Sequence, residues 1–428
     1  MHHFINFKGF AHAALDLFRP LTVLIGPNGS GKSNVIEGVE LLSFIAHGRP
    51  LHEISDVGRG VNGLEIRGGL AECARHGQNS FDLGFFASIN FEGEMRPFGY
   101  TVSVGTKPEP RIISESLAFL EGPTIFKTVG RRPGRASADI KVEYNNFARG
   151  GKKPHVHVSS NHSVLSEYKE FATKNTKYQV CVEVVNGIMN YLRASFVFDP
   201  NPKLMRVYER MGNRILSRDG ANLSAVLYGL SKGTKEQKRS LERLVGWIKH
   251  LPEEPYYGMD FVETRLNDVI FGLREVDSDW LVDARLLSDG TLRSLAVLTA
   301  LETVDHNSRV VIEEFDNGLH PSRLRLLTDA MKSCCDRRKL NVLVTTHNPV
   351  TLNGLESEQL EGVAFCAWDT EEMAFKLIRL YDLPRYDEFL ERGPLGDLVT
   401  RRVVEQYLAP RFEENQKQKA LAWIQKLP

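Results

Sequence analysis

The spacing of hydrophobic and polar residues near the start of the chain predicts a strand, a glycine-rich loop and a helix in succession. Phe4 to Phe10 and Leu21 to Ile25 are apolar runs with the length of strands. The second run leads directly into the segment from Gly26 to Ser33, and apolar residues then recur at helical spacing from Asn34 to Ala46. The chain therefore begins in the manner of an α/β domain.

The middle of the chain changes in character twice. Short β-like runs separated by turn residues extend from about Gly63 to Leu120 and predict an antiparallel β subdomain. The segment from Lys127 to Lys153 contains eight Lys or Arg residues and only two acidic residues, with Gly and Pro interspersed. This composition predicts an exposed loop or insertion. Helical spacing follows from Val164 to Leu192 and from Leu223 to His250, on either side of a strand-like run from Ala194 to Phe198.

The last third of the chain alternates strands and helices. A helix is predicted after Ser288, a strand from Val310 to Ile312, a helix from Pro321 and a strand from Asn341 to Thr345. An amphipathic helix from Glu413 to Leu427 closes the chain. The predicted domains are lobe one with the glycine loop and the antiparallel subdomain (1–125), a basic insertion and helical region (126–280), lobe two (281–370) and a C-terminal tail (371–428).

Composition narrows the function without identifying it. The 54 Lys and Arg residues cancel the 54 Asp and Glu residues, so no global field attracts the protein to nucleic acid or to a membrane surface. The five cysteines lack the spacing of a zinc site or a redox motif, which favours reduced thiols in a cytosol. No N-terminal apolar segment and no run long enough to span a bilayer is present, so we expect a cytoplasmic protein without a membrane anchor.

The segment Gly26-Pro-Asn-Gly-Ser-Gly-Lys-Ser33 fits the Walker A pattern of a phosphate-binding loop. Its glycines let successive backbone N–H groups surround a phosphate, while Lys32 reaches the β- and γ-phosphates and Ser33 ligates Mg²⁺. A glycine-rich turn without a ligand is the alternative, but it would have to fall between a strand and a helix by chance. The predicted nucleotide-binding residues are Gly26, Asn28, Gly29, Ser30, Gly31, Lys32, Ser33 and Asn34.

Three further segments could contribute to the same nucleotide site, and each is a weak signal when taken alone. Val310 to Glu314 is an apolar strand ending in two acids, which suits one carboxylate near Mg²⁺ and one that polarises a water, although such strand ends are usually only solvent-facing. Ser288 and the N–H groups around Gly290 begin a helix, where they could contact a phosphate or simply cap the helix. His347 lies at a strand's carboxyl end, where α/β sheets bind ligands, and a structural histidine is the alternative there.

In this order the motifs resemble those of the ABC-type ATPases of the SMC, RecF, RecN and OLD group, and most closely the small bacterial AAA-family ATPases of anti-phage defence systems. The resemblance covers most of the chain, and the ordered set is far more specific than any one motif. The segments that carry it are the Walker A pattern, Leu287 to Thr291, Val310 to Glu314, Asn317 to Pro321, Thr345 to His347, Asn6 to Phe10, Arg218 to Leu223 and Gly393 to Asp397.

The resemblance implies a role for each matching residue. Lys32 and Ser33 bind phosphate and Mg²⁺, Glu313 takes the metal-side Walker B role, Glu314 is the catalytic base, His347 senses the γ-phosphate, and Ser288 and Gly290 form a signature motif that acts on the nucleotide of a second protomer.

This sequence departs from the family pattern in three ways. Glu313 stands where an aspartate is usual, and Asp289 stands where the signature motif often has glycine. No glutamine can be assigned to the Q-loop. A longer Glu313 could still reach Mg²⁺ through a water, but we expect slow turnover.

The resemblance also implies partners. ATP would join two heads into a homodimer or a higher oligomer. We expect the motor or sensor of an anti-phage system that acts with a separate effector, a nuclease or a toxin. Apart from the resemblance, the basic charge of Lys127 to Lys153 could contact the phosphates of DNA or RNA, and a solvated loop is the alternative there. Three alternatives stay open: a scaffold ATPase in which ATP binding alone drives assembly, a self-contained OLD-like nuclease, and a DNA-repair ATPase like SMC or RecF. The nuclease alternative lacks a paired acidic motif after His347.

Overall fold

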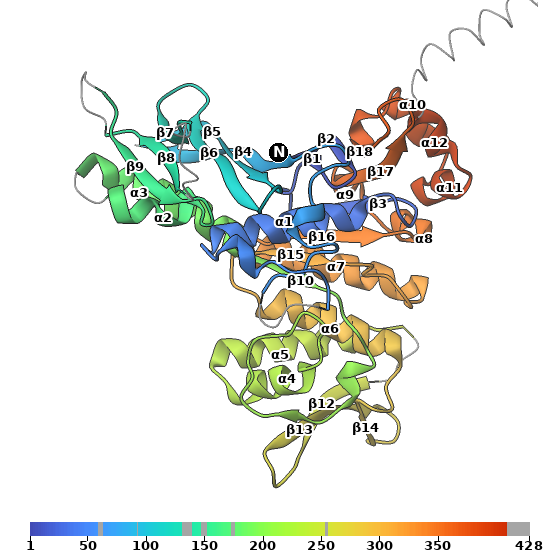
Figure 1. Cartoon of the computed structure of the whole chain (residues 1–428). Helices are drawn as coiled ribbons and strands as arrows, with labels where there is room; N and C mark the ends of the chain where they lie inside the picture. Colours follow the sequence, from blue (N-terminus) through green and yellow to red (C-terminus); the bar gives the residue numbers. More distant parts are fainter. Residues whose placement is uncertain are drawn as a thin grey trace, which may run out of the picture. The chain divides into compact units, whose positions relative to one another are not determined.

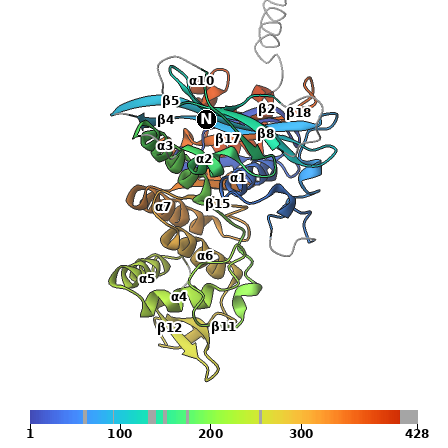
Figure 2. The ribbon, with the colours of Figure 1, turned by 60° about the vertical axis from the view of Figure 1, so that its left-hand side comes forward.

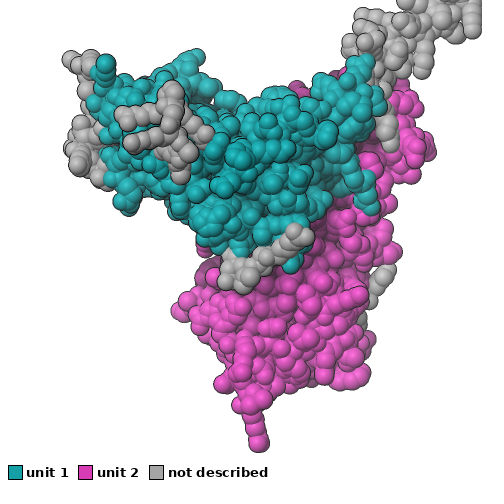
Figure 3. Space-filling model, viewed as in Figure 1, with its two compact units in different colours: residues 1–18, 28–195, 366–377 teal, residues 19–27, 196–365, 378–428 magenta. Residues whose placement is uncertain are grey.

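The computed structural model describes residues 1–58, 63–91, 93–130, 139–146, 152–172, 176–252 and 256–408. The chain folds into two compact units, which are coloured separately in Figure 3. Unit 1 comprises residues 1–18, 28–195 and 366–377, and unit 2 comprises residues 19–27, 196–365 and 378–428. The four-segment division made from the sequence stays a prediction.

Unit 1 is built on a largely antiparallel sheet with the strand order β18-β2-β1-β4-β5-β6-β7-β8-β9. Figure 2 shows helices α1, α2 and α3 on one side of the strands β4 and β5. These helices contact one another and, between them, the strands β1, β4 and β9. The sheet and the predicted antiparallel subdomain therefore coincide over β4 to β6. The elements are β1 (His2–Phe7), β2 (Phe10–Leu15), α1 (Lys32–Ala46), β4 (Ser80–Phe91), β5 (Glu94–Gly105), β6 (Arg111–Phe119), β7 (Thr124–Thr128), β8 (Asp139–Tyr144), β9 (His155–Ser159), α2 (Val164–Ala172), α3 (Thr176–Arg193) and β18 (Ala374–Arg379).

Strand β8 corrects the sequence prediction of an exposed loop from Lys127 to Lys153. Ile140 and Val142 are buried, at 2% and 0% exposure, while Lys141 and Glu143 alternate with them on the opposite face. Such alternation predicts a strand, but the basic residues around it favoured the prediction of a loop. Residues 131–138 and 147–151 of the segment lie outside the described residues.

The run from Phe4 to Phe10 also differs from its prediction, because it forms parts of two strands. Strand β1 ends at Phe7, and a turn through Lys8, whose φ is 52°, leads into β2 at Phe10. The two strands pair in antiparallel fashion, with Phe7 opposite Phe10. The apolar run is thus a tight hairpin whose phenylalanines are buried.

Unit 2 contains a sheet with the strand order β10-β15-β16-β3-β17, in which β15, β16, β3 and β17 run parallel. Helices α6 and α7 contact this sheet, and α4 and α5 lie between α6 and a small antiparallel sheet of β11 to β14 (Figure 1). The elements are β3 (Leu21–Ile25), β10 (Ser195–Phe198), β11 (Glu209–Arg210), α4 (Leu223–Lys232), α5 (Lys235–Ile248), β12 (Tyr256–Glu263), β13 (Asp268–Glu275), β14 (Leu281–Asp283), α6 (Asp289–Thr303), β15 (Arg309–Ile312), α7 (Pro321–Arg338), β16 (Asn341–Thr346), α8 (Pro349–Asn353), α9 (Ser357–Leu360), β17 (Val363–Asp369), α10 (Tyr386–Glu391), α11 (Leu395–Thr400) and α12 (Val403–Leu408).

The strands of the parallel sheet are mostly apolar and buried along their length, as expected where both faces of a sheet are covered. Leu21 to Ile25, Arg309 to Ile312 and Val342 to Thr346 are buried throughout. Together with α6 and α7 they form the core of unit 2. The predicted helices after Ser288 and from Pro321 and the two strands near them are confirmed to within about a residue.

Two further sequence predictions concern the C-terminal helix and membrane-spanning segments. The helix predicted from Glu413 to Leu427 lies outside the described residues. None of the helices that the structure describes combines the length and the apolar character needed to cross a lipid bilayer.

Candidate nucleotide site

The parallel strands of unit 2 bring four predicted site residues to one edge of the sheet. Ile312 of β15 pairs with Val344 of β16, and Thr346 of β16 pairs with Ile25 of β3. Because these strands are parallel, the residues that follow them lie at the same, carboxyl edge. Those residues are Gly26 after β3, Glu313 and Glu314 after β15, and His347 after β16.

Glu314 is held in an unusual backbone conformation at this edge. Its φ is 45°, in the left-handed region that side chains disfavour, and its backbone N–H donates to Oγ1 of Thr345 at 2.9 Å. Its carboxylate accepts a hydrogen bond from Nδ2 of Asn317 at 3.2 Å and lies 3.6 Å from Nδ1 of His347. The side chains of Glu314 and His347 are 36% and 43% exposed, so both are accessible to a ligand or a water.

Asp316 connects the two strand ends and was missed by sequence reasoning. It is buried, and its Oδ2 accepts hydrogen bonds from the hydroxyls of Thr346 at 2.5 Å and of Thr351. Thr346 directly precedes His347, so Asp316 fixes the position from which the histidine projects. Its position two residues after Glu314 is the sequence feature that could have marked it as a site residue.

The signature segment shows the helix-capping role, one of the two roles that the sequence left open for Ser288. Its Oγ accepts a hydrogen bond from the backbone N–H of Thr291 at 3.1 Å, so Ser288 is the N-cap of α6. A Cβ built on Gly290 would lie 3.0 Å from Nη1 of Arg323, which leaves little room for a side chain. The contact of Ser288 with a phosphate stays a prediction.

Arg206 anchors the same segment and was also missed. Its guanidinium donates to the carbonyl oxygen of Leu287 at 2.8 Å and pairs with Oδ1 of Asp289 at 2.6 Å. Asp289, which stands where the family often has glycine, thus forms an ion pair with Arg206. Sequence alone could not pair two residues so far apart in the chain.

Unit 1 carries the rest of the Walker A segment. Helix α1 begins at Lys32, two residues earlier than predicted, and Gly31 before it has a φ of 100°. Gly29 has a φ of 79°, and a Cβ there would meet no atom within 4 Å. Lys32 is buried, and Oδ1 of Asn34 accepts a hydrogen bond from Arg67 at 3.1 Å.

These features fit a nucleotide with Mg²⁺. Two glycines in left-handed conformations precede the N-terminus of a 15-residue helix, which is the kind of backbone that phosphate-binding loops use. Ser33 offers a hydroxyl and Glu313 a carboxylate, which are the oxygen donors that Mg²⁺ prefers. The residues present therefore suit the predicted ligand in chemistry as well as in pattern.

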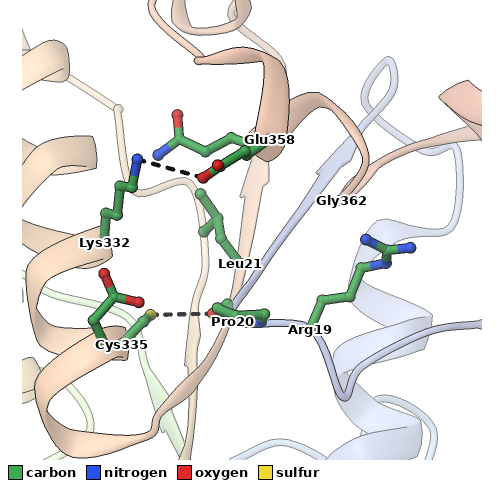
Figure 4. Close-up of a pocket in the computed structure, with 9 residues that line it drawn as sticks. Arg19, Pro20, Leu21, Lys332, Cys335, Glu358 and Gly362 are labelled. Carbon is green, nitrogen blue, oxygen red and sulfur yellow. Dashed lines mark hydrogen bonds and ion pairs between the residues drawn. The ribbon is translucent and has the colours of Figure 1, made fainter.

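A small cavity lies at the opposite edge of the sheet, at the amino end of β3 (Figure 4). Its volume is about 120 Å³, below the roughly 300–1,000 Å³ of typical ligand pockets. Sγ of Cys335 donates to the carbonyl oxygen of Pro20 at 3.1 Å, and Lys332 lies 3.6 Å from Glu358 there. The cavity is too small for a nucleoside triphosphate and lacks the predicted site residues.

Comparison with curated proteins finds short segments of similarity. A segment of 43 residues is 44% identical to the DNA replication and repair protein RecF of Acaryochloris marina and covers 10% of this chain and 12% of that protein. A segment of 82 residues is 35% identical to RecF of a Picosynechococcus species and covers 19% of this chain and 20% of that protein. The chain thus spans a fifth or less of these relatives' length.

Among solved structures, the SMC head domain from Thermotoga maritima is similar at 12% identity and a TM-score of 0.38, over 88% of this chain and 97% of that one. The Smc head domain with an extended coiled coil bound to the C-terminal domain of ScpA, derived from Pyrococcus furiosus, is similar at 9% identity and a TM-score of 0.46, over 91% and 98%. The α/β class expected from the sequence is confirmed by the parallel sheet and the helices that follow its strands. Residues 21–353 match the family model described as "AAA domain, putative AbiEii toxin, Type IV TA system", and the chain belongs to that family.

Proposed function

We propose that the protein binds ATP with Mg²⁺ and hydrolyses it slowly. The observation that carries the proposal is the pairing of Glu314 with His347 at the sheet edge from which the Walker A segment departs. Bound ATP would supply the phosphoryl group. The N–H groups of the loop and Lys32 would hold phosphate oxygens, and Ser33 and Glu313 would hold the metal.

The proton chemistry falls to Glu314. Its accessible carboxylate would take a proton from the attacking water, and the resulting hydroxide oxygen would form the new bond to phosphorus as ADP leaves. His347 would hydrogen-bond the γ-phosphate and keep it in line with the carboxylate. The left-handed backbone at Glu314, whose N–H donates to Thr345, and the hydrogen bond that Asn317 donates to the carboxylate limit where that carboxylate can point.

The direct test compares wild-type protein with Lys32→Ala. Wild-type protein should bind ATP with Mg²⁺ and release phosphate slowly, whereas Lys32→Ala should lose most of its affinity because a phosphate contact is gone. Unchanged ATP affinity in Lys32→Ala would remove the assignment of the loop.

We further propose that ATP joins two copies, with Ser288 and Gly290 of each facing the nucleotide of the other. The support is the N-terminus of α6, a 15-residue helix whose positive end suits an anion. Glu314→Gln with ATP should enrich a dimer in light scattering, and adding Ser288→Arg should prevent it. Equal masses with and without ATP in both variants would count against the assembly.

We also propose a role in defence, in which the protein acts with a separate effector. The family description names a toxin system, and the notable chemistry of the chain lies in the ATP site. Purified protein should hydrolyse ATP but leave plasmid DNA and tRNA intact with Mg²⁺ or Mn²⁺. Cleavage by the isolated chain, lost on mutation outside the ATP site, would favour the self-contained nuclease. Growth arrest on expression of this chain alone would make the chain itself the effector.

Contact with nucleic acid through Lys127 to Lys153 stays part of the proposal. Two of the described basic side chains there already have partners, since Lys127 lies 3.4 Å from Glu143 and Lys153 donates to Asn145 at 2.6 Å. Any phosphate contact would therefore compete with these interactions or use the segment's other basic residues.

A further inference from the structure

A hydrogen bond ties the Walker A loop to the strand β17. Residues 366–369 of β17 belong to unit 1, and there Sγ of Cys366 donates to the carbonyl oxygen of Ser30 at 2.7 Å. Burial raises the pKa of the Cys366 thiol to about 12, so the thiol keeps its proton and remains a donor. Side chains alternate along a strand, so Trp368 projects from the same face of β17 as Cys366. Trp368 therefore lies on the side of the strand that meets the loop.

Phe375 of β18 packs between this tryptophan and the loop. Its ring meets that of Trp368 edge to face, with centroids 5.0 Å apart and an interplanar angle of 74°. A Cβ built on Gly31 would lie 3.0 Å from Cδ2 of Phe375, and one built on Gly9 only 2.3 Å from it. Both glycines thus leave room for the ring. Gly31, Phe375 and Trp368 form a continuous packed row.

The hairpin that carries the two aromatic residues is fixed at its turn. Lys376 lies 2.6 Å from Asp369 and 3.0 Å from Glu372, and Arg75 donates to the carbonyl oxygens of Glu372 and Met373 at 3.0 and 3.1 Å. Trp368 is nevertheless 46% exposed. A large aromatic face on a fixed support is suited to receive a planar ligand.

The order of strands gives the direction of the ligand. Within unit 2, β3 lies between β16 and β17. Glu314 and His347 follow β15 and β16, so the proposed ATP site would hold the γ-phosphate on that side of β3 and leave the β17 side to the other end of the nucleotide. Trp368 lies three residues beyond Phe365, which pairs with Ile25 at the end of β3.

We propose that Trp368 stacks on the base of the bound nucleotide, an inference that rests on the proposed ATP binding. The indole supplies a π face, and Phe375 sets its orientation from the loop. Stacking is tolerant of base identity because every base has a π face. Trp368 should therefore contribute to the affinity for ATP and GTP alike and contribute nothing to the affinity for inorganic tripolyphosphate.

The experiment measures the affinity of the full chain for ATP and for tripolyphosphate, each with Mg²⁺, by equilibrium dialysis or calorimetry. Trp368→Ala should weaken ATP binding about 5- to 30-fold, the range expected for one lost stacking contact on a half-exposed ring. It should leave tripolyphosphate binding unchanged, and Trp368→Phe should restore most of the ATP affinity. Trp280→Ala, at a second exposed tryptophan (64% exposed), is the matched control and should change neither affinity.

Intrinsic fluorescence provides a readout independent of affinity. ATP should change the tryptophan emission of wild-type protein and of Trp280→Phe, but not that of Trp368→Phe, and tripolyphosphate should leave all three unchanged. Wild-type protein that binds neither ligand would refute the proposed ATP function itself. Wild-type protein that binds ATP through Lys32, with equal affinity and equal emission change in the Trp368 variants, would overturn only the stacking role.

Discussion

Two glutamates of unit 2 occupy opposite physical situations. Glu302, near the C-terminal end of α6, has a side chain only 1% exposed and lies between two guanidinium groups, with Arg243 at 3.1 Å and Arg337 on its other oxygen. Glu314, at the end of β15, is 36% exposed and contacts Asn317 and His347. One carboxylate is neutralised in the interior, whereas the other remains accessible on a strained backbone.

The surroundings of Glu302 show what a structural acid requires. Burial raises the pKa of the neighbouring Cys334 thiol to about 12, and the charge of Glu302 adds to the rise. The thiol therefore stays protonated and faces Oε1 of Glu302 at 3.6 Å. A buried carboxylate needs such partners because desolvation of a charge is costly. Glu314 has solvent access in place of such partners, which suits the proposed role as a base that exchanges protons with water.

The largest expected effect is on turnover. Glu314→Gln removes the proposed proton acceptor but keeps the shape of the side chain, so phosphate release should fall about 10²- to 10⁴-fold while ATP affinity and unfolding free energy stay close to wild type. Glu302→Gln is the matched control and should retain turnover. Wild-type turnover in Glu314→Gln would place the base elsewhere.

The reverse experiment targets stability. Glu302→Gln leaves Arg243 and Arg337 without their shared carboxylate, which should lower the unfolding free energy by about 2–4 kcal/mol. The estimate lies below that for a fully buried pair because the two arginines are 29% and 33% exposed and can regain water. Urea unfolding measures the change. A loss of less than about 0.5 kcal/mol would show that the network of α5, α6 and α7 does not depend on this charge.

A smaller effect is expected at Asp316, which is buried like Glu302 but lies beside the strand ends that carry Glu314 and His347. Asp316→Asn keeps the size of the side chain but weakens acceptance from Thr346 and Thr351, so unfolding free energy should fall by about 1–2 kcal/mol. Because Thr346 precedes His347, turnover should also fall, by less than in Glu314→Gln. Urea unfolding and phosphate release on the same samples separate the two effects, and full turnover would show that His347 does not need this support.

The sequence predicted the parts of this arrangement that depend on local pattern. Apolar runs located β3, β15 and β16, and Glu314 and His347 were recognisable as site candidates because each follows the carboxyl end of such a strand. The contacts of Arg206 with Asp289 and of Phe375 with Gly31 could not be predicted, because each joins residues that only the tertiary fold brings together. Strand β8 was predictable from its alternation but was obscured by its charged neighbours.

The smallest effect is expected at the other end of α6, where Ser288 has a structural role that can be separated from its proposed functional one. Ser288→Ala removes the acceptor for the N–H of Thr291 and should cost about 1 kcal/mol of unfolding free energy. Ser288→Asp keeps a capping oxygen, and its charge suits a helix N-terminus, so stability should stay within about 0.5 kcal/mol of wild type. If a phosphate of a second copy approaches Ser288, however, the added carboxylate would repel it. In the Glu314→Gln background, Ser288→Asp should therefore abolish ATP-dependent dimerisation in light scattering despite normal stability, whereas Ser288→Ala should weaken it only partly. Normal dimerisation by Ser288→Asp would leave Ser288 as a helix cap alone.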